Sequence, residues 1–216
     1  MHVEIWFDVV CPWCYLGKTR FQRALESFEH REEVTVTYRS FELDPFADST
    51  QTLRTVDVLA DKYGMSPAQA EDAQRQMEQR AAADGLDFKM ADLRSGNTRD
   101  AHRLIHLAAD RGLQAELADR LFRAYFTEQA SIFDRDSLTE LAVEVGLDRD
   151  EVLAVLASDH YADAVQTDEE MARVLGATGV PLFVIDRRYG ISGAQPAEVM
   201  TQALNQAWAA AAGASA

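Results

Sequence analysis

The chain contains two cysteines, and both lie in the tetrapeptide Cys11-Pro12-Trp13-Cys14. A disulfide between residues so close in sequence closes almost no loop and would contribute little to stability. The same spacing suits thiol–disulfide exchange, which needs one thiolate that attacks and a second thiol that resolves the mixed disulfide. We therefore predict a redox-active pair, with Cys11 as the nucleophile and Cys14 as the resolving thiol.

The tetrapeptide lies where a predicted strand meets a predicted helix. Residues 3–7 are rich in β-forming side chains, and a helix from about residue 14 to 28 follows, because apolar residues recur at helical spacing at Phe21, Ala24, Leu25 and Phe28. Free N–H groups at the start of that helix would stabilise a thiolate on Cys11. Pro12 suits a first helical turn because its ring fixes φ. Trp13 is expected to be exposed and to form part of the substrate surface.

A zinc site is the alternative use of two such cysteines. Structural zinc normally takes four protein ligands, and no further cysteine exists. Two of the five histidines, His102 and His106, stand four apart on a predicted helix and could give one edge of a metal site. Because a structural zinc site requires a closed set of four ligands, we favour the dithiol and expect no metal and no organic cofactor.

The rest of the chain predicts two αβ segments around a helical one. An alternating segment at 34–41 makes a second strand, and strand, helix and strand form a βαβ unit whose strands are parallel. Residues 49–163 show helix after helix without a strand signal. A helix at 162–175 then precedes β-rich stretches at 180–186 and 189–193 and a last helix that Pro196 opens.

Length and composition fit one large domain with or without an insertion, at 216 residues and 47% hydrophobic. The net charge of −15 argues against nucleic acid and anionic membranes as partners. No apolar run reaches the roughly 18 residues of a membrane span. The chain begins on a predicted strand rather than on a secretory leader, so we expect a cytoplasmic protein.

The tripeptide Gly179-Val180-Pro181 precedes the third predicted strand. Proline inside a strand signal argues against a central strand. Immediately before an apolar run, Pro181 could carry a cis peptide bond, for which proline is the only common route. The alternative is an ordinary trans proline at the start of a strand.

Taken together, these motifs resemble the DsbA-like branch of the thioredoxin superfamily, and within it the FrnE-like subgroup. The resemblance covers nearly the whole chain and rests on the segments 8–17, 97–103, 179–183 and 191–195. It implies an α/β, thioredoxin-like fold with a large all-helical insertion. The thioredoxin-like domain would comprise residues 1–48 and 164–216, and the insertion residues 49–163.

The resemblance also implies a substrate site. Val180-Pro181 would be a cis peptide beside the disulfide, and the backbone of Val180 would pair with an extended substrate. The insertion would form a lid, with Asn97 and His102 lining the cleft. The residues themselves leave alternatives open, namely Asn97 as a helix N-cap and His102 as a surface or interface residue.

Two departures from related enzymes stand out. Thioredoxin-like proteins often carry a buried acid on the first strand as a proton relay, but that position is Ile5 here. Glu4 and Asp8 are the nearest acids, and Asp8 could cap the active-site helix instead. Secreted DsbA enzymes have histidine at the position of Trp13, so we expect this protein to be less oxidising than they are.

Two other functions share the fold or the cysteines. The related 2-hydroxychromene-2-carboxylate isomerases and kappa-class glutathione transferases carry serine at the position of Cys11, where they activate bound glutathione. A redox-sensing chaperone would use the same thiols as a sensor. The presence of both cysteines favours disulfide exchange with a protein, peptide or small-molecule partner, with glutathione as a possible co-substrate and a homodimer as a possible assembly.

Overall fold

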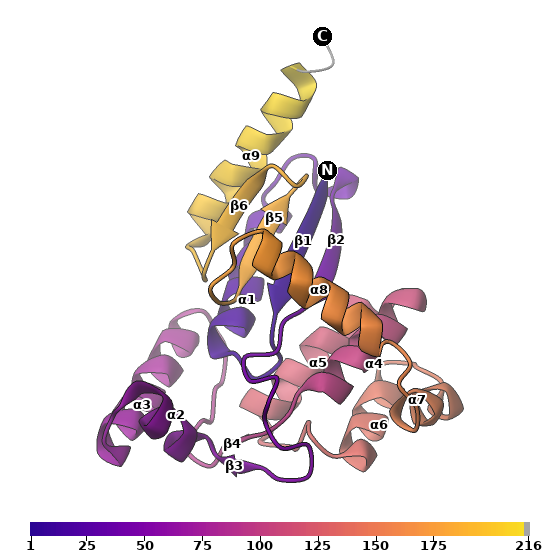
Figure 1. The fold of residues 1–216 in the computed structure, drawn as a ribbon. Coiled ribbons are helices and arrows are strands. Elements are labelled where there is room, and N and C mark those ends of the chain that lie inside the picture. The colour runs from indigo at the N-terminus through magenta and orange to yellow at the C-terminus, as the bar shows by residue number, and fades with distance from the viewer. Residues whose placement is uncertain (214–216) are drawn as a thin grey trace.

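A four-stranded mixed sheet forms the centre of the protein (Figure 1). The computed structural model describes residues 1–213. The strand order is β2-β1-β5-β6, built from β1 (His2–Phe7), β2 (Thr35–Ser40), β5 (Leu182–Ile185) and β6 (Tyr189–Ser192). β1 and β2 are parallel, as expected for strands joined through a helix, and β5 is antiparallel to both of its neighbours.

Helices cover both faces of this sheet. α1 (Pro12–Glu26) and α9 (Ala197–Gly213) pack together on one face, and α8 (Ala162–Val174) crosses the other (Figure 1). Strand side chains alternate between faces, so β1 directs one set of residues toward α1 and the other toward α8. The set on the α1 side is Val3, Ile5 and Phe7, and the residue that packs with α8 is Trp6.

A buried ion-pair network ties α8 to the sheet. Arg39 on β2 contacts the carboxylates of Glu4 at 2.7 Å and Asp168 at 3.1 Å. The indole of Trp6 donates a hydrogen bond to the Asp168 carbonyl at 2.8 Å. Because an unpaired buried charge is costly, this network fixes the position of α8 over β1 and β2.

The region between β2 and α8 lies at the end of the sheet where α1 begins, with α2 and α3 on one side and α4 to α7 on the other (Figure 1). Its elements are β3 (Leu53–Arg54), α2 (Thr55–Tyr63), α3 (Pro67–Ala83), β4 (Arg94–Ser95), α4 (Arg99–Asp110), α5 (Gln114–Phe126), α6 (Arg135–Glu144) and α7 (Arg149–Leu156). The expectation of a region without strands was wrong, because β3 and β4 pair as an antiparallel ladder. Strands of two residues are too short to produce an alternating pattern.

The predicted boundaries shift by a few residues. The first helix begins at Pro12 rather than near residue 14, and the last begins at Ala197, just after Pro196. The second strand is shorter than predicted at both ends. Among the described residues, none of the helices combines the length and the apolar character that crossing a membrane requires.

Candidate active site

The tetrapeptide forms the junction between β1 and α1. Cys11 is the N-cap of α1 with extended backbone angles, φ −88° and ψ 111°, and Pro12 is the first helical residue. The Cys11 N–H donates to the Asp8 carbonyl at 3.1 Å, and the Cys14 N–H donates to the Cys11 carbonyl at 3.0 Å. Both cysteines are therefore held on the first turn of the helix.

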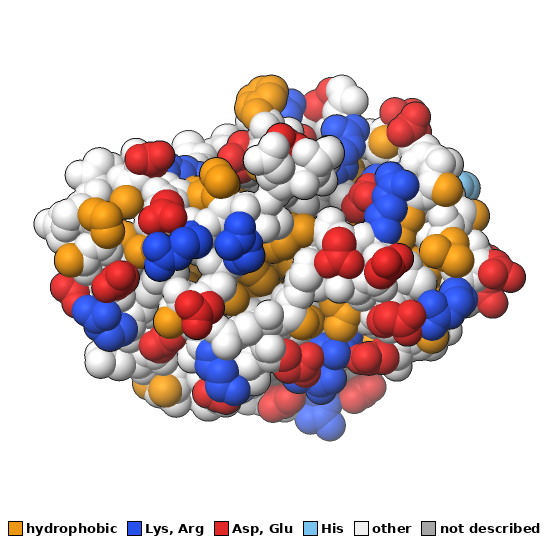
Figure 2. All heavy atoms as spheres, turned by 90° about the horizontal axis from the view of Figure 1, so that it is seen from below, with side chains coloured by type: hydrophobic (Ala, Val, Ile, Leu, Met, Phe, Trp, Pro, Cys, Tyr) orange, Lys and Arg blue, Asp and Glu red, His pale blue; other side chains and the backbone are white. Residues whose placement is uncertain are grey.

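The two thiols are unpaired and nearly covered, whereas the residue between them is open. Cys11 is 3% exposed and Cys14 is 1% exposed, while Trp13 is 41% exposed. The expectation of an exposed Trp13 is confirmed. Figure 2 views the molecule from the α1-start end of the sheet and shows a hollow with hydrophobic side chains on its floor and basic and acidic side chains around it.

The Val180–Pro181 peptide bond is cis, and it lies against Cys11. The Cys11 Sγ is 3.6 Å from the Val180 carbonyl oxygen. Gly17 permits this approach, because a Cβ there would lie 2.9 Å from Pro181 Cγ and 3.4 Å from a ring carbon of Phe183. Glycine at this position lets α1 pack directly on the proline.

The Cys14 thiol lies deep in the protein, 1% exposed. Burial is the main cause that raises the pKa of the Cys14 thiol well above its ordinary value, and a hydrogen bond with Cys11 and the charge of Asp8 add to the effect. A thiol with a raised pKa remains protonated near neutral pH and is a poor initial nucleophile. The raised pKa therefore argues against Cys14 as the residue that attacks first.

Asp8 is fixed behind the cysteines by contacts from two other segments. Its Oδ2 accepts a hydrogen bond from the Leu43 N–H at 2.8 Å, and its Oδ1 lies 3.4 Å from His102 Nε2. The idea that the Asp8 side chain caps α1 was wrong, since its backbone carbonyl receives the Cys11 N–H and its carboxylate turns inward. A buried acid is thus present near Cys14, on a residue that follows the strand.

Glu42 extends this buried polar group. Its Oε2 and the Nδ1 of His102 are the two buried side-chain nitrogen or oxygen atoms without a hydrogen-bond partner in the part of the chain that the structure describes. Burial raises the pKa of Glu42 from 4.5 to about 7, with nearby His102 opposing the shift and Glu169 adding to it. Glu42 is therefore largely neutral below pH 7.

The two polar residues that sequence analysis placed in the cleft have different positions. His102 is completely buried on α4 and packs edge-on against Phe7, so it is not a surface residue and does not line an open cleft. Asn97 is half-buried; its side chain donates to the Ala47 carbonyl and accepts from the Arg99 N–H. The N-cap of α4 is the next residue, Thr98.

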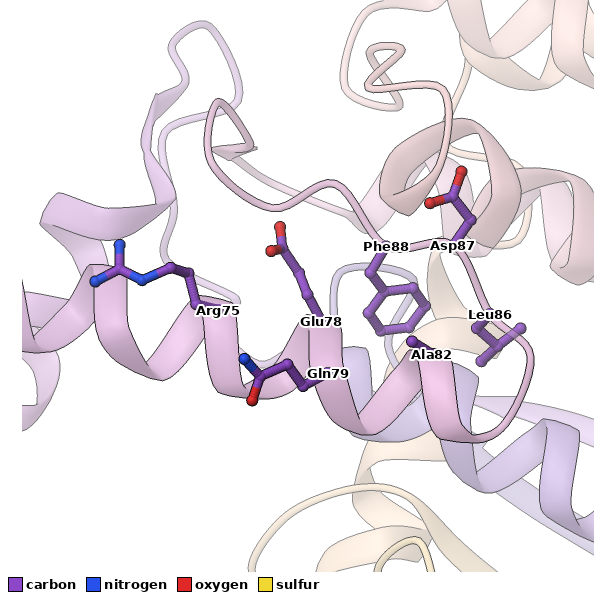
Figure 3. Close-up of a pocket in the computed structure, with 7 residues that line it drawn as sticks. All are labelled: Arg75, Glu78, Gln79, Ala82, Leu86, Asp87 and Phe88. Atoms are coloured by element: carbon purple, nitrogen blue, oxygen red, sulfur yellow. The ribbon is translucent and has the colours of Figure 1, made fainter.

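Two hollows lie near the insertion helices. One of about 370 Å³ includes Asn97 with residues from the 47–49 loop, α4 and the start of α6 and α8. Another of about 330 Å³ runs along α3 (Figure 3). The second is lined by Arg75, Glu78, Gln79, Ala82, Leu86, Asp87 and Phe88. None of these seven belongs to the tetrapeptide or to the cis peptide.

Sequence reasoning missed Glu42 and Arg80, and it gave Asp8 a capping role rather than its buried position behind the cysteines. Asp8 lies one residue after the end of β1, and Glu42 lies two residues after the end of β2. Arg80 on α3 stacks on Trp13, with its Cζ 5.6 Å from the ring centroid. Sequence carries no signal for that contact, because it depends on how the insertion packs.

Comparison with known proteins identifies the family of the chain. A family model described as a DSBA-like thioredoxin domain matches residues 2–205. The chain belongs to this family. Within it, the chain is 52% identical to a probable DsbA oxidoreductase from Streptomyces coelicolor, whose crystal structure superposes with a TM-score of 0.93 over 97% of this chain and 90% of that one.

Two more distant proteins are also similar. An uncharacterised Bacillus subtilis protein, YwbO, is 29% identical over 95% of this chain and 96% of its own. The cytosolic disulfide reductase DsbM from Pseudomonas aeruginosa, solved with GSH, is 18% identical with a TM-score of 0.64 over 95% of this chain and 98% of that one. At that identity, the likeness to DsbM is one of fold.

Proposed function

We propose that this DsbA-like protein is a thiol–disulfide oxidoreductase that works through Cys11 and Cys14. The observation that carries the proposal is the arrangement of two unpaired thiols on the first turn of α1 beside the Val180 carbonyl. Burial raises the pKa of the Cys14 thiol, which assigns first attack to Cys11. Disulfide exchange between these thiols and a substrate requires no metal and no organic cofactor.

In the reducing direction, the Cys11 thiolate attacks one sulfur of a substrate disulfide. A bond forms between Cys11 and that sulfur, and the other substrate sulfur leaves as a thiolate that takes a proton from water. Cys14 then attacks Cys11 Sγ, which closes the protein disulfide and releases the second substrate thiol. Two electrons pass from the protein to the substrate, and the reverse sequence oxidises a substrate dithiol.

The resolving step requires Cys14 to lose its proton in a buried site. Asp8 is the carboxylate whose charge acts on Cys14, and it is fixed by Leu43 and His102. We infer that Asp8 accepts this proton and that His102 positions Asp8 rather than touching substrate.

For substrate binding, the backbone of Val180 is the proposed partner of an extended substrate segment, and the insertion with Asn97 is the proposed lid. DsbM, a cytosolic protein of the same fold solved with GSH, supports glutathione as a co-substrate and the cytoplasm as the place of action. Which direction dominates depends on the reduction potential of the pair relative to its compartment.

The deciding experiment is a redox titration of the protein against glutathione, monitored by tryptophan fluorescence and by counting free thiols. A two-electron transition in the wild type, lost in Cys11→Ser and in Cys14→Ser, is the expected result. In addition, Cys14→Ser should accumulate a mixed disulfide on Cys11. If no internal disulfide forms at any ratio of oxidised to reduced glutathione, disulfide exchange is wrong and glutathione-dependent isomerisation becomes the leading function.

A further inference from the structure

Arg80 is an unpaired cation held beside the active-site dithiol. It projects from α3 over the ring of Trp13, the exposed residue between the two cysteines. No carboxylate and no hydrogen-bond acceptor among the described residues pairs with its guanidinium, whereas most other arginines have such a partner. In a chain of net charge −15, a free positive group at this place is unusual.

The ion pairs that join the end of α3 to α1 explain why Arg80 stays free. Helical spacing offers Arg80 one acidic neighbour, Asp84, four residues later. Asp84 is already engaged by Arg20 at 2.7 Å and by Arg23 at 2.9 Å, both from α1. The position four residues earlier is the neutral Gln76. The carboxylate that could neutralise Arg80 is therefore used to join the two helices.

The position of Arg80 over Trp13 also favours binding of an anion. The guanidinium is planar, and its N–H groups point outward from the edge of that plane. That fork matches the two oxygens of a carboxylate. The cation–π contact with Trp13 reduces the side-chain freedom that a carboxylate ligand would otherwise have to restrict.

From this geometry we propose that Arg80 forms a carboxylate-binding position beside the dithiol, so that the protein prefers disulfides and thiols that carry a carboxylate close to the reacting sulfur. The inference rests on the proposed function and names its substrate class. Arg80 acts on binding and on the approach of the substrate, while the electron transfer remains with Cys11 and Cys14.

Two disulfide probes separate the charge from the chemistry. Reduced protein is mixed in a stopped-flow instrument with 5,5′-dithiobis(2-nitrobenzoate), which carries carboxylates, and with 4,4′-dithiodipyridine, which is neutral near pH 7.5. Absorbance of the released thiol gives the second-order rate constant. In Arg80→Ala the rate constant with the carboxylate probe should fall about fivefold, the size expected of a solvent-exposed ion pair, while that with the neutral probe is unchanged.

Two further variants test the charge without removing the stacking side chain. Gln76→Glu places a carboxylate one helical turn before Arg80 and should neutralise it, reducing the preference for the charged probe. Arg75→Ala removes a cation of the same helix that is already paired with Asp72 and should have no effect. Added salt should reduce the preference of the wild type.

The outcomes are distinct. Equal slowing of both probes in Arg80→Ala would overturn the proposal and leave Arg80 as a packing partner of Trp13. An unchanged preference in both Arg80→Ala and Gln76→Glu would overturn it as well. A wild type that reacts with neither probe, or that forms no internal disulfide afterwards, would instead contradict the proposed function.

Discussion

Replacing Glu42 by glutamine should make the protein more stable at alkaline pH and leave it unchanged at acid pH. Glu42 is buried, and its pKa is raised to about 7 in the folded protein, compared with 4.5 when it is exposed. The folded state therefore holds the proton more tightly than the unfolded state does. The stability that this proton contributes is complete below pH 4.5 and is lost as the pH rises through 7.

The size of the effect follows from the two pKa values. Each pH unit between them is worth 1.36 kcal/mol, so ionising Glu42 destabilises the folded state by at most about 3 kcal/mol above pH 7. Glutamine has nearly the same shape and never ionises, so Glu42→Gln escapes this cost. The variant should match the wild type near pH 4 and exceed it by up to about 3 kcal/mol near pH 8.5.

The assay is urea unfolding of both proteins across this range of pH, with the difference in unfolding free energy plotted against pH. Taking the difference cancels the titration of the groups that do not interact with Glu42. Glu140→Gln is the matched control, because Glu140 is exposed and its pKa is lowered by Arg149; that variant should gain nothing at high pH. A difference between Glu42→Gln and wild type that does not change with pH would refute the assignment of Glu42 as a neutral buried acid.

Two other substitutions test the site geometry. Gly17→Ala should destabilise the protein by about 1–3 kcal/mol in thermal or urea unfolding, because the added Cβ meets Pro181 at 2.9 Å and overpacks the helix against it. Gly213→Ala, whose Cβ meets nothing within 4 Å, is the control and should not destabilise; equal behaviour of the two would contradict the close contact. Asp8→Asn should slow the resolution of the mixed disulfide by Cys14 about a hundredfold, the scale of a lost general base, and leave the first attack unaffected. Quenched-flow mass spectrometry measures both steps, and unchanged resolution would exclude Asp8 as the proton acceptor.

Local patterns in the sequence were enough to predict much of the sheet and the place of the thiols. Strand β1, the active-site helix and β2 each show their own period of apolar residues, and that period is set by the backbone geometry of the element itself. The position of Cys11 and Cys14 at the helix start follows from the same pattern. The position of Val180-Pro181 against Cys11 came from the family resemblance, because the residues themselves left a cis and a trans proline open.

The sequence could not predict which polar groups gather behind the thiols. His102 lies on a helix whose apolar face was visible, yet its contact with Asp8 joins residues 94 positions apart. The spacing typical of thioredoxin-like proteins would place a buried acid at position 5, which is Ile5 here. In the structure the buried acid behind the cysteines is Asp8, in the loop after β1. The length of β3 and β4, at two residues each, leaves no period to detect.

What the sequence alone determined is therefore the place of the two cysteines and their local frame, the start of a helix in a βαβ unit, because those features depend on neighbours within a few residues. Only the tertiary structure decided the environment of that dithiol. Burial raises the pKa of the Cys14 thiol, and folding brings Asp8 and His102 together. Asp84 forms an ion pair with Arg20 of α1, so that Arg80 is left free over Trp13. These effects depend on desolvation and on contacts between distant segments, which exist only once the helical insertion has packed against the sheet.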